Sequence, residues 1–437
     1  MGASAGAVTE AEESRLEVDP EEIKHALLDR REIAILDVRS EAEYASGHPL
    51  FAASLPLGRI EHEAYARLPY RSVSIVVYDA GGGEAPFAVN RLASIGYPNV
   101  SMLRGGLNGW RASGGEVFSD VNVPSKAFGE LVVETRSTPL LPAQQLATMI
   151  DSGADVVVVD ARRFDEFQTM SIPSATSVPG GELVYRASAF ASSPSTTIVV
   201  NCAGRTRSIV GAQSLLNAGV PNKVMALENG TIGWKLAGLE LEHNRDALLV
   251  DSSARPETVS STRLLADRTG VQRLKLSELH ESRFHSKTLY RFDVRTAQEF
   301  EAGHLAGFRW VEGGQLIQET DSFAPVRGAA IVLSDHDGVR ANMAASWLAQ
   351  MNWSVYVLDD TEEAGLVTGR SDDELAAVPL ITEARHRELA RRSVRDRYRR
   401  PYVGTDVSPE AMQSYLTWEF GLVEQLARDG THGFFVI

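Results

Sequence analysis

The sequence holds a single cysteine, Cys202, among 437 residues. One thiol cannot form an intrachain disulfide, a zinc site that needs two thiolates from one chain, or an intramolecular dithiol centre. The ten histidines are scattered without metal-ligand spacing. We therefore expect no metal and no other cofactor.

Long apolar runs and an excess of basic charge are also lacking. No run approaches the roughly 18 apolar residues that span a bilayer, and the small, acidic residues 1–17 do not resemble a secretory signal. We expect a cytoplasmic protein with no membrane partner and a disordered N-terminal tail. The net charge of −15 argues against a nucleic-acid partner, and the arginine-rich residues 381–400 are interpreted as a solvated helix face.

What the chain does contain is a three-fold repeat. Three apolar runs end in Asp-x-Arg, at residues 33–39, 157–162 and 289–295, and each is followed four residues after its Arg by a Glu. A second apolar run follows in each copy, and the residue directly after it lies 42 positions after the Asp of the motif: Asp79, Cys202 and Asp335. Each copy alternates strands and helices, which predicts parallel α/β layers whose ligands bind at the carboxyl ends of strands.

These repeats divide the chain. We expect a tail over 1–17, a first domain over 18–118, a linker over 119–139, a second domain over 140–242, a linker over 243–271 and a third domain over 272–365. Residues 366–437 form a helical C-terminal segment. Within it residues 408–429 are predicted to be one helix, with Ser408 as N-cap, Gly430 after its end and an apolar face. That face comprises Met412, Tyr415, Leu416, Leu422, Val423 and Leu426.

The second copy contains the candidate nucleophile. Cys202 follows a buried strand and precedes a short loop and a helix, which is a typical setting for a nucleophile. The loop N–H groups and the helix N-terminus favour an anion, and Arg205 and Arg207 add two positive charges. We expect these groups to depress the thiol pKa and to attract a small anionic substrate.

The three repeated units resemble rhodanese domains, which have the sulfurtransferase fold. The resemblance rests on the Asp-x-Arg motifs, on the Gly-His that follows them at Gly47 and Gly303, on the 202–208 loop and on the closing segments 102–110 and 226–234. It implies three tandem rhodanese-like α/β domains, each a parallel sheet flanked by helices. The central copy departs from the pattern, since residues 170–173 replace the Gly-His.

The resemblance also implies a reaction. Cys202 would take sulfane sulfur from an anionic donor such as thiosulfate, form a persulfide and pass the sulfur to cyanide, a thiol or a protein acceptor. The substrate would be held by the loop, which comprises Ala203, Gly204, Arg205, Thr206, Arg207 and Ser208. Arg162 and Glu166 are interpreted as a structural ion pair, because their spacing suits a helix and the outer copies repeat it.

The outer copies have Asp79 and Asp335 where the thiol should be, and the first has Glu84 at the position of Arg207. A carboxylate cannot form a persulfide, so both domains should be catalytically silent. Two alternatives stay open. One is a sulfur carrier or adaptor whose silent domains bind partners. The other is a cysteine phosphatase, which the four residues between Cys202 and Arg207 disfavour, because phosphatase loops place five there.

Overall fold

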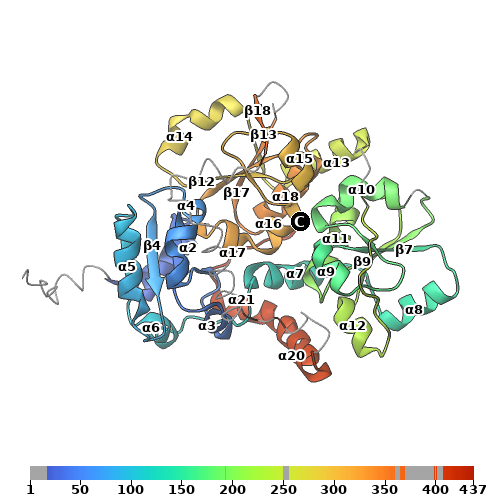
Figure 1. Cartoon of the computed structure of the whole chain (residues 1–437), viewed down its shortest axis with the longest axis horizontal. Helices are drawn as coiled ribbons and strands as arrows, with labels where there is room; N and C mark the ends of the chain where they lie inside the picture. The colour runs from blue at the N-terminus through green and yellow to red at the C-terminus, as the bar shows by residue number, and fades with distance from the viewer. Residues whose placement is uncertain are drawn as a thin grey trace, which may run out of the picture.

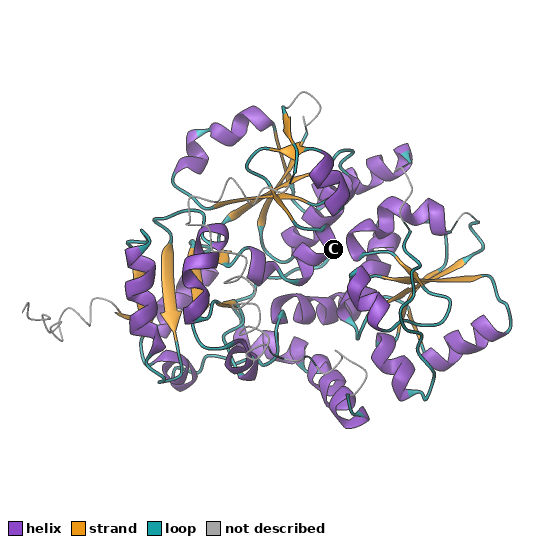
Figure 2. Cartoon of the chain, in the orientation of Figure 1, coloured by secondary structure: helices purple, strands orange, loops and turns teal. Residues whose placement is uncertain are grey.

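The computed structural model describes residues 17–191, 193–249, 255–359, 365–369, 398, 400 and 407–437. Three α/β domains surround a central region in which the chain ends (Figure 1). Figure 2 shows that helices flank the strands in every domain. The predicted tail and nearly all of the arginine-rich stretch lie outside the described residues, but Glu17, expected in the tail, lies in strand β1 (Glu17–Val18).

The first domain is built on a sheet in the order β1-β5-β4-β2, with β3 and β15 both pairing with β2. Its own strands are parallel, and β2 is buried along its whole length, as expected for a sheet covered on both faces. The strands are β2 (Ile33–Asp37), β3 (Ala52–Ser54), β4 (Ser74–Tyr78) and β5 (Val100–Leu103). The helices are α2 (Pro20–Leu28), α3 (Glu41–Ser46), α4 (Ile60–Arg67), α5 (Glu84–Ser94) and α6 (Gly106–Ala112).

The second domain repeats this plan with a parallel sheet in the order β6-β10-β9-β7-β8. Asp160 and Asn201 are register partners at the carboxyl ends of β7 and β9, so the residues that follow meet at one sheet edge. The strands are β6 (Leu140–Leu141), β7 (Val156–Asp160), β8 (Thr176–Ser177), β9 (Thr197–Asn201) and β10 (Val224–Leu227). The helices are α8 (Ala143–Asp151), α9 (Phe164–Thr169), η3 (Gly180–Glu182), α10 (Leu183–Phe190), α11 (Thr206–Asn217) and α12 (Gly230–Leu236).

The third domain has a parallel sheet in the order β11-β17-β16-β12-β14. The strands are β11 (Gln272–Leu274), β12 (Leu289–Asp293), β14 (Arg309–Trp310), β16 (Ala330–Ser334) and β17 (Ser354–Leu358), with a separate antiparallel pair of β13 (His304–Leu305) and β18 (Leu366–Val367). The helices are η4 (Leu276–His280), α14 (Ser282–His285), α15 (Ala297–Ala302), α16 (Gly313–Gln318), α17 (Thr320–Phe323) and α18 (Val339–Gln350). Strand β15 (Val326–Arg327) leaves this domain and pairs antiparallel with β2, joining the two outer domains.

The two segments expected as linkers contain helices. Residues 119–139 hold α7 (Val123–Arg136), most of which is buried and which packs against α11 and α21. Residues 243–271 hold α13 (Pro256–Arg268), which packs against α18 of the third domain. A reading of the sequence by polarity misses these helices because their buried residues include polar side chains, such as Lys126 and Glu130 of α7 and Thr262 of α13.

The predicted C-terminal helix is two helices, α20 (Pro409–Phe420) and α21 (Leu422–Asp429), separated at Gly421. Ser408 caps the first by accepting a hydrogen bond from the Ala411 N–H, and Gly430 ends the second in the left-handed region. The predicted apolar face is buried except at Val423, which is partly exposed. Within the described part of the chain, no helix has both the length and the apolar character needed to cross a membrane.

Candidate active site

Cys202 lies directly after β9 and four residues before α11 begins, at the carboxyl end of the central sheet. Its side chain is only 2% exposed, and its Sγ donates to the Ser208 Oγ over 3.4 Å. The Ser208 hydroxyl in turn donates to the Arg205 carbonyl over 2.8 Å. Ser208 therefore joins the thiol to the loop backbone from the first turn of α11.

The loop backbone is held in place by the start of α12. The Thr231 N–H donates to the Cys202 carbonyl over 2.9 Å, and the Ile232 N–H donates to the Ala203 carbonyl over 3.0 Å. Gly230 adopts φ +55°, and a Cβ there would lie 2.4 Å from the Cys202 carbonyl oxygen. Glycine is required at this point because loop and helix approach too closely for a side chain.

Arg207 and Glu166 form a partly buried bidentate ion pair across the site. Nη1 and Nη2 of Arg207 lie 2.6 and 2.9 Å from the two oxygens of Glu166. Burial alone would raise the pKa of Glu166, but Arg207, with smaller contributions from other arginines, outweighs it and lowers that pKa to about 2. The carboxylate is therefore ionised throughout the physiological range, and it fixes the guanidinium beside the thiol.

The structure corrects the predicted Arg162–Glu166 pair. Arg162 instead binds Asp160, with Nε 2.9 Å from Oδ1 and Nη2 2.7 Å from Oδ2, and its Nη2 also donates to the Met170 carbonyl. The helical spacing does not apply because α9 begins at Phe164, after Arg162. Arg162 thus holds the strand end, whereas Glu166 holds Arg207.

Arg205 lies against α7 and α20. Its side chain is buried and forms a bidentate pair with Glu130 of α7, with Nε–Oε1 at 2.7 Å and Nη2–Oε2 at 2.9 Å. It also donates to the Asn229 Oδ1 and lies over the Phe420 ring, 4.4 Å from its centroid. Gly129 allows this approach, because a Cβ there would be 2.9 Å from the Thr206 side chain. Arg205 therefore anchors the loop.

The thiol does not have the depressed pKa that the sequence suggests. Burial raises the pKa of Cys202, and the positive charge of Arg207 and hydrogen bonds from Ser208 oppose that shift without cancelling it. Both loop arginines are paired with carboxylates, Arg205 with the buried Glu130 and Arg207 with the partly buried Glu166, so they do not supply two free positive charges. Arg207 remains the loop cation that favours the thiolate.

The C-terminal helix α20 covers the loop, which the sequence does not indicate. Ala203 and Ile232 share an apolar cluster with three residues of its buried face, Met412, Tyr415 and Leu416. Next to them the Tyr415 hydroxyl donates to Glu419 Oε1 over 2.7 Å, and a Cβ on Gly204 would lie 3.3 Å from Glu419 Oε2. Burial raises the pKa of Glu419 to about 7.

The two residues missed by sequence reasoning, Glu130 and Glu419, come from segments outside the repeat. An acidic residue amid the apolar faces of α7 and α20 is the signal that could have found them, since a buried carboxylate requires a partner.

In the first domain the corresponding loop is occupied by its own carboxylate. Asp79 Oδ1 accepts from the Gly81 N–H over 2.8 Å, and Oδ2 accepts from the Ala85 N–H over 3.0 Å. The Leu107 N–H binds the Asp79 carbonyl as Thr231 binds that of Cys202. The loop is therefore arranged like the Cys202 loop, but its Gly81 and Ala85 N–H groups are already hydrogen-bonded to the Asp79 carboxylate.

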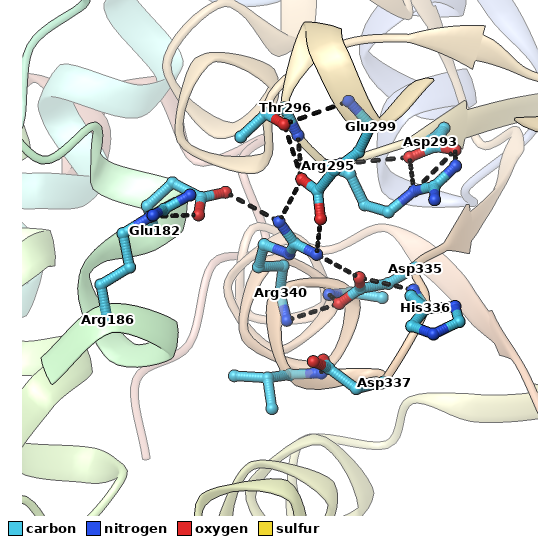
Figure 3. A network of polar contacts seen from close by, with 12 residues as sticks. Glu182, Arg186, Asp293, Arg295, Thr296, Glu299, Asp335, His336, Asp337 and Arg340 are labelled. Atoms are coloured by element: carbon cyan, nitrogen blue, oxygen red, sulfur yellow. Dashed lines mark hydrogen bonds and ion pairs between the residues drawn. The ribbon is translucent and has the colours of Figure 1, made fainter. Parts of the chain in front are cut away.

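The third domain fills its loop in the same way and adds a cation, as Figure 3 shows. Asp335 accepts from the backbone N–H groups of His336, Arg340 and Ala341. The Arg340 guanidinium binds Asp335 at 3.1 Å and Glu299 at 2.7 and 2.9 Å. It also reaches Glu182 of the second domain at 3.3 Å, so the Asp335 loop forms part of the domain interface.

The geometry thus provides one buried thiol, on a loop whose N–H groups and Arg207 can stabilise an anion. Three segments, residues 19–113, 142–237 and 276–361, match the family described as "Rhodanese-like domain". The crystal structure of a thiosulfate sulfurtransferase from Pseudomonas aeruginosa is similar, with a TM-score of 0.90 and 46% identity, covering 96% of this chain and 99% of that one. A curated sulfurtransferase from Allochromatium vinosum is 31% identical over 98 residues, 22% of this chain and 90% of that protein.

Proposed function

This chain belongs to the family of rhodanese-like domains, and we propose that its second domain transfers sulfane sulfur from thiosulfate through a Cys202 persulfide. The observation that carries the proposal is the single thiol of the chain, placed at the focus of a loop whose equivalents in the other two domains hold carboxylates. Only the central loop has an atom that can accept sulfur.

The reaction divides into two displacements. In the first, the Cys202 thiolate attacks the outer sulfur of thiosulfate, a new S–S bond forms, and sulfite leaves with the electron pair of the bond that breaks. In the second, cyanide or a thiolate attacks the outer persulfide sulfur, and the Cys202 thiolate leaves. Arg207 and the Ser208 hydrogen bonds stabilise the thiolate in both steps.

Because burial raises the thiol pKa, the first step depends on the small fraction of thiolate present near neutral pH. We expect sulfur uptake to accelerate as the pH rises toward the thiol pKa. Arg205 has a positioning role in this proposal. Its charge is paired with that of Glu130, so it holds the loop in place rather than binding thiosulfate.

The silent domains act as structural supports. Strand β15 of the third domain completes the sheet of the first, and Arg340 joins the third domain to Glu182 of the second. These contacts support a rigid assembly around one working centre. Binding of a protein sulfur acceptor by the outer domains is the second candidate role.

The test is the formation of thiocyanate from thiosulfate and cyanide. We expect wild-type protein to turn over and Cys202→Ser to lose about a thousandfold or more of that rate, because the nucleophile is removed. Thermal unfolding of the variant should match wild type. Turnover by Cys202→Ser at the wild-type rate contradicts the proposal, and hydrolysis of aryl phosphates by wild-type protein in place of sulfur transfer would favour the phosphatase alternative.

A further inference from the structure

A cavity of about 510 Å³ lies between the first and third domains, remote in sequence from the Cys202 loop. One wall is the end of α4 with residues 69–70, and the other is η4, α14, β12 and the turn before β14. In Figure 1, α4 of the first domain and β12 of the third are neighbours where the two outer domains meet. The volume is in the range of small-molecule binding sites.

The charge of this cavity is opposite to that of the protein. Although the chain carries a net charge of −15, none of the described residues that line the cavity is Asp or Glu. Glu32, which does not line the cavity, is already bound by the Thr288 N–H at 3.0 and 3.1 Å. The basic lining residues are His280, His285, Lys287, Arg291 and Arg309.

Arg291 is the unusual member of this group. It lies two residues before the Asp of the Asp-x-Arg motif, where the other two domains have the buried residues Ile35 and Val158. Its side chain is half-buried, and its Nε is buried without a hydrogen-bond partner among the described residues. Burial lowers the pKa of Arg291, and no carboxylate offsets that shift.

A half-buried cation without a counter-charge lowers stability, so its presence in the middle of a strand calls for a compensating function. Arg309 differs from it, because its Nη1 donates to the Ala66 carbonyl over 2.6 Å and ties the third domain to the first. Arg291 is therefore the lining arginine whose guanidinium finds no hydrogen-bond partner among the described residues.

The remaining walls are aromatic. Rings of Tyr65, Tyr70, Phe284 and Phe308 line the cavity, and the Tyr290 hydroxyl is already bound to the Arg67 carbonyl over 2.8 Å. An inorganic anion would leave these apolar walls without contacts, and a neutral apolar molecule would leave Arg291 unpaired. The complementary ligand has both an anionic head and an apolar body.

We propose that this cavity binds a small organic anion, a carboxylate, sulfonate or phosphate on an aromatic or similarly apolar body, with its head on Arg291. The guanidinium edge suits the paired oxygens of such a head. The site uses residues of the two silent domains only, so it gives those domains a binding role separate from sulfur transfer.

The test is calorimetric titration of the full chain with naphthalene-2-sulfonate and with the neutral naphthalene-2-sulfonamide. Wild-type protein should bind one sulfonate per chain, about tenfold or more tightly than the sulfonamide, since the charged head is what differs. Arg291→Gln should lose about tenfold or more of the sulfonate affinity and none of the sulfonamide affinity. Equal affinity for the two probes, or no binding of the sulfonate by wild-type protein, overturns the proposal.

Controls separate this site from general surface charge and from the catalytic centre. Arg268→Gln, which removes an arginine from the last turn of α13 outside the cavity, should bind the sulfonate as wild type does. Cys202→Ser should also bind the sulfonate with wild-type affinity. This proposal and the sulfur-transfer proposal can therefore fail independently. If Arg291→Gln does not fold, Arg291→Met keeps the stem volume and takes its place. Sulfonate affinity equal to wild type in the folded variant contradicts the assignment.

Discussion

The central loop and the two outer loops have the same backbone arrangement, but the central loop has a thiol where each outer loop has a carboxylate. In all three domains a strand ends, a short loop follows, and the residue six positions after the key position lies in the first turn of the next helix. In the outer domains the N–H of that residue is bound by Asp79 or Asp335, and in the central domain it belongs to Ser208, beside the thiol. The loop itself is a feature of the fold, and in the function we propose catalysis depends on the side chain at the key position and on the charges around it.

The most demanding test of this difference between the loops is to introduce a cysteine in place of the aspartate of an outer loop. In a Cys202→Ser background, Asp79→Cys should take up no sulfur from thiosulfate, because Glu84 stands at the position of Arg207 and repels the donor. Asp335→Cys should take up less than one sulfur per chain, since Arg340 is already paired with Glu299 and Glu182. Mass spectrometry of the intact chain measures both, and stoichiometric labelling of Asp79→Cys would show that domain one remains competent.

A second difference is the anchor of the central loop. The position of Arg205 is a glycine in the outer loops, Gly82 and Gly338, so only the central loop is tied to α7. Glu130→Ala should lower the free energy of unfolding by about 3–5 kcal/mol, because it leaves the Arg205 charge buried and unpaired. Chemical denaturation measures this cost.

The matched control for that anchor is Asp359→Ala, which opens the exposed Arg263–Asp359 pair and should cost less than about 1 kcal/mol. Adding Arg205→Met to Glu130→Ala should recover part of the lost stability. An unfolding free energy of Glu130→Ala equal to that of wild type would show that the anchor is unimportant.

Much of this architecture could be predicted from the sequence, because the 42-residue spacing and the strand ends are periodic features. The position of Cys202 after β9 and the presence of Asp79 and Asp335 at the equivalent positions follow from aligning the repeats. The anchors do not, since α7 and α20 lie outside the repeats and Glu130 and Glu419 reach the loop only through the tertiary fold. The predicted partner of Glu166 is also wrong, because Arg162 precedes α9 rather than lying on it.

The helix α20, which covers the central loop, should make the stability of the protein depend on pH. The pKa of Glu419 is raised from 4.5 to about 7, chiefly by burial, with Lys126 opposing and Glu130 adding to the shift. The folded state therefore holds this proton more tightly than the unfolded state. Its contribution to stability is complete below pH 4.5 and is lost as the pH rises through about 7.

Glu419→Gln should remove that loss, making the variant more stable than wild type at pH 8 by up to about 3 kcal/mol, with little difference near pH 4. Unfolding measured across this pH range tests the prediction. Glu424→Gln, an exposed position on α21, is the control and should follow wild type throughout. Parallel pH profiles of Glu419→Gln and wild type would mean that Glu419 does not carry the dependence.

The smallest expected effect separates the two arginines of the central loop. Arg207→Ala should raise the KM for thiosulfate roughly tenfold to a hundredfold, because a charge-assisted contact to the anion is lost. Arg205→Ala should leave KM nearly unchanged and act on kcat and stability, since its partner is Glu130. Steady-state kinetics on both variants test this split, and negligible changes of KM in both would remove Arg207 from the donor site.

The proposal that the Cys202 Sγ is the one atom of the chain that carries sulfur can be tested by the intact mass of wild-type protein after incubation with thiosulfate. We expect a gain of one sulfur atom per chain, lost on addition of cyanide and absent from Cys202→Ser. A wild-type chain that gains no sulfur, or a Cys202→Ser variant that still gains it, would show that Cys202 does not have this role.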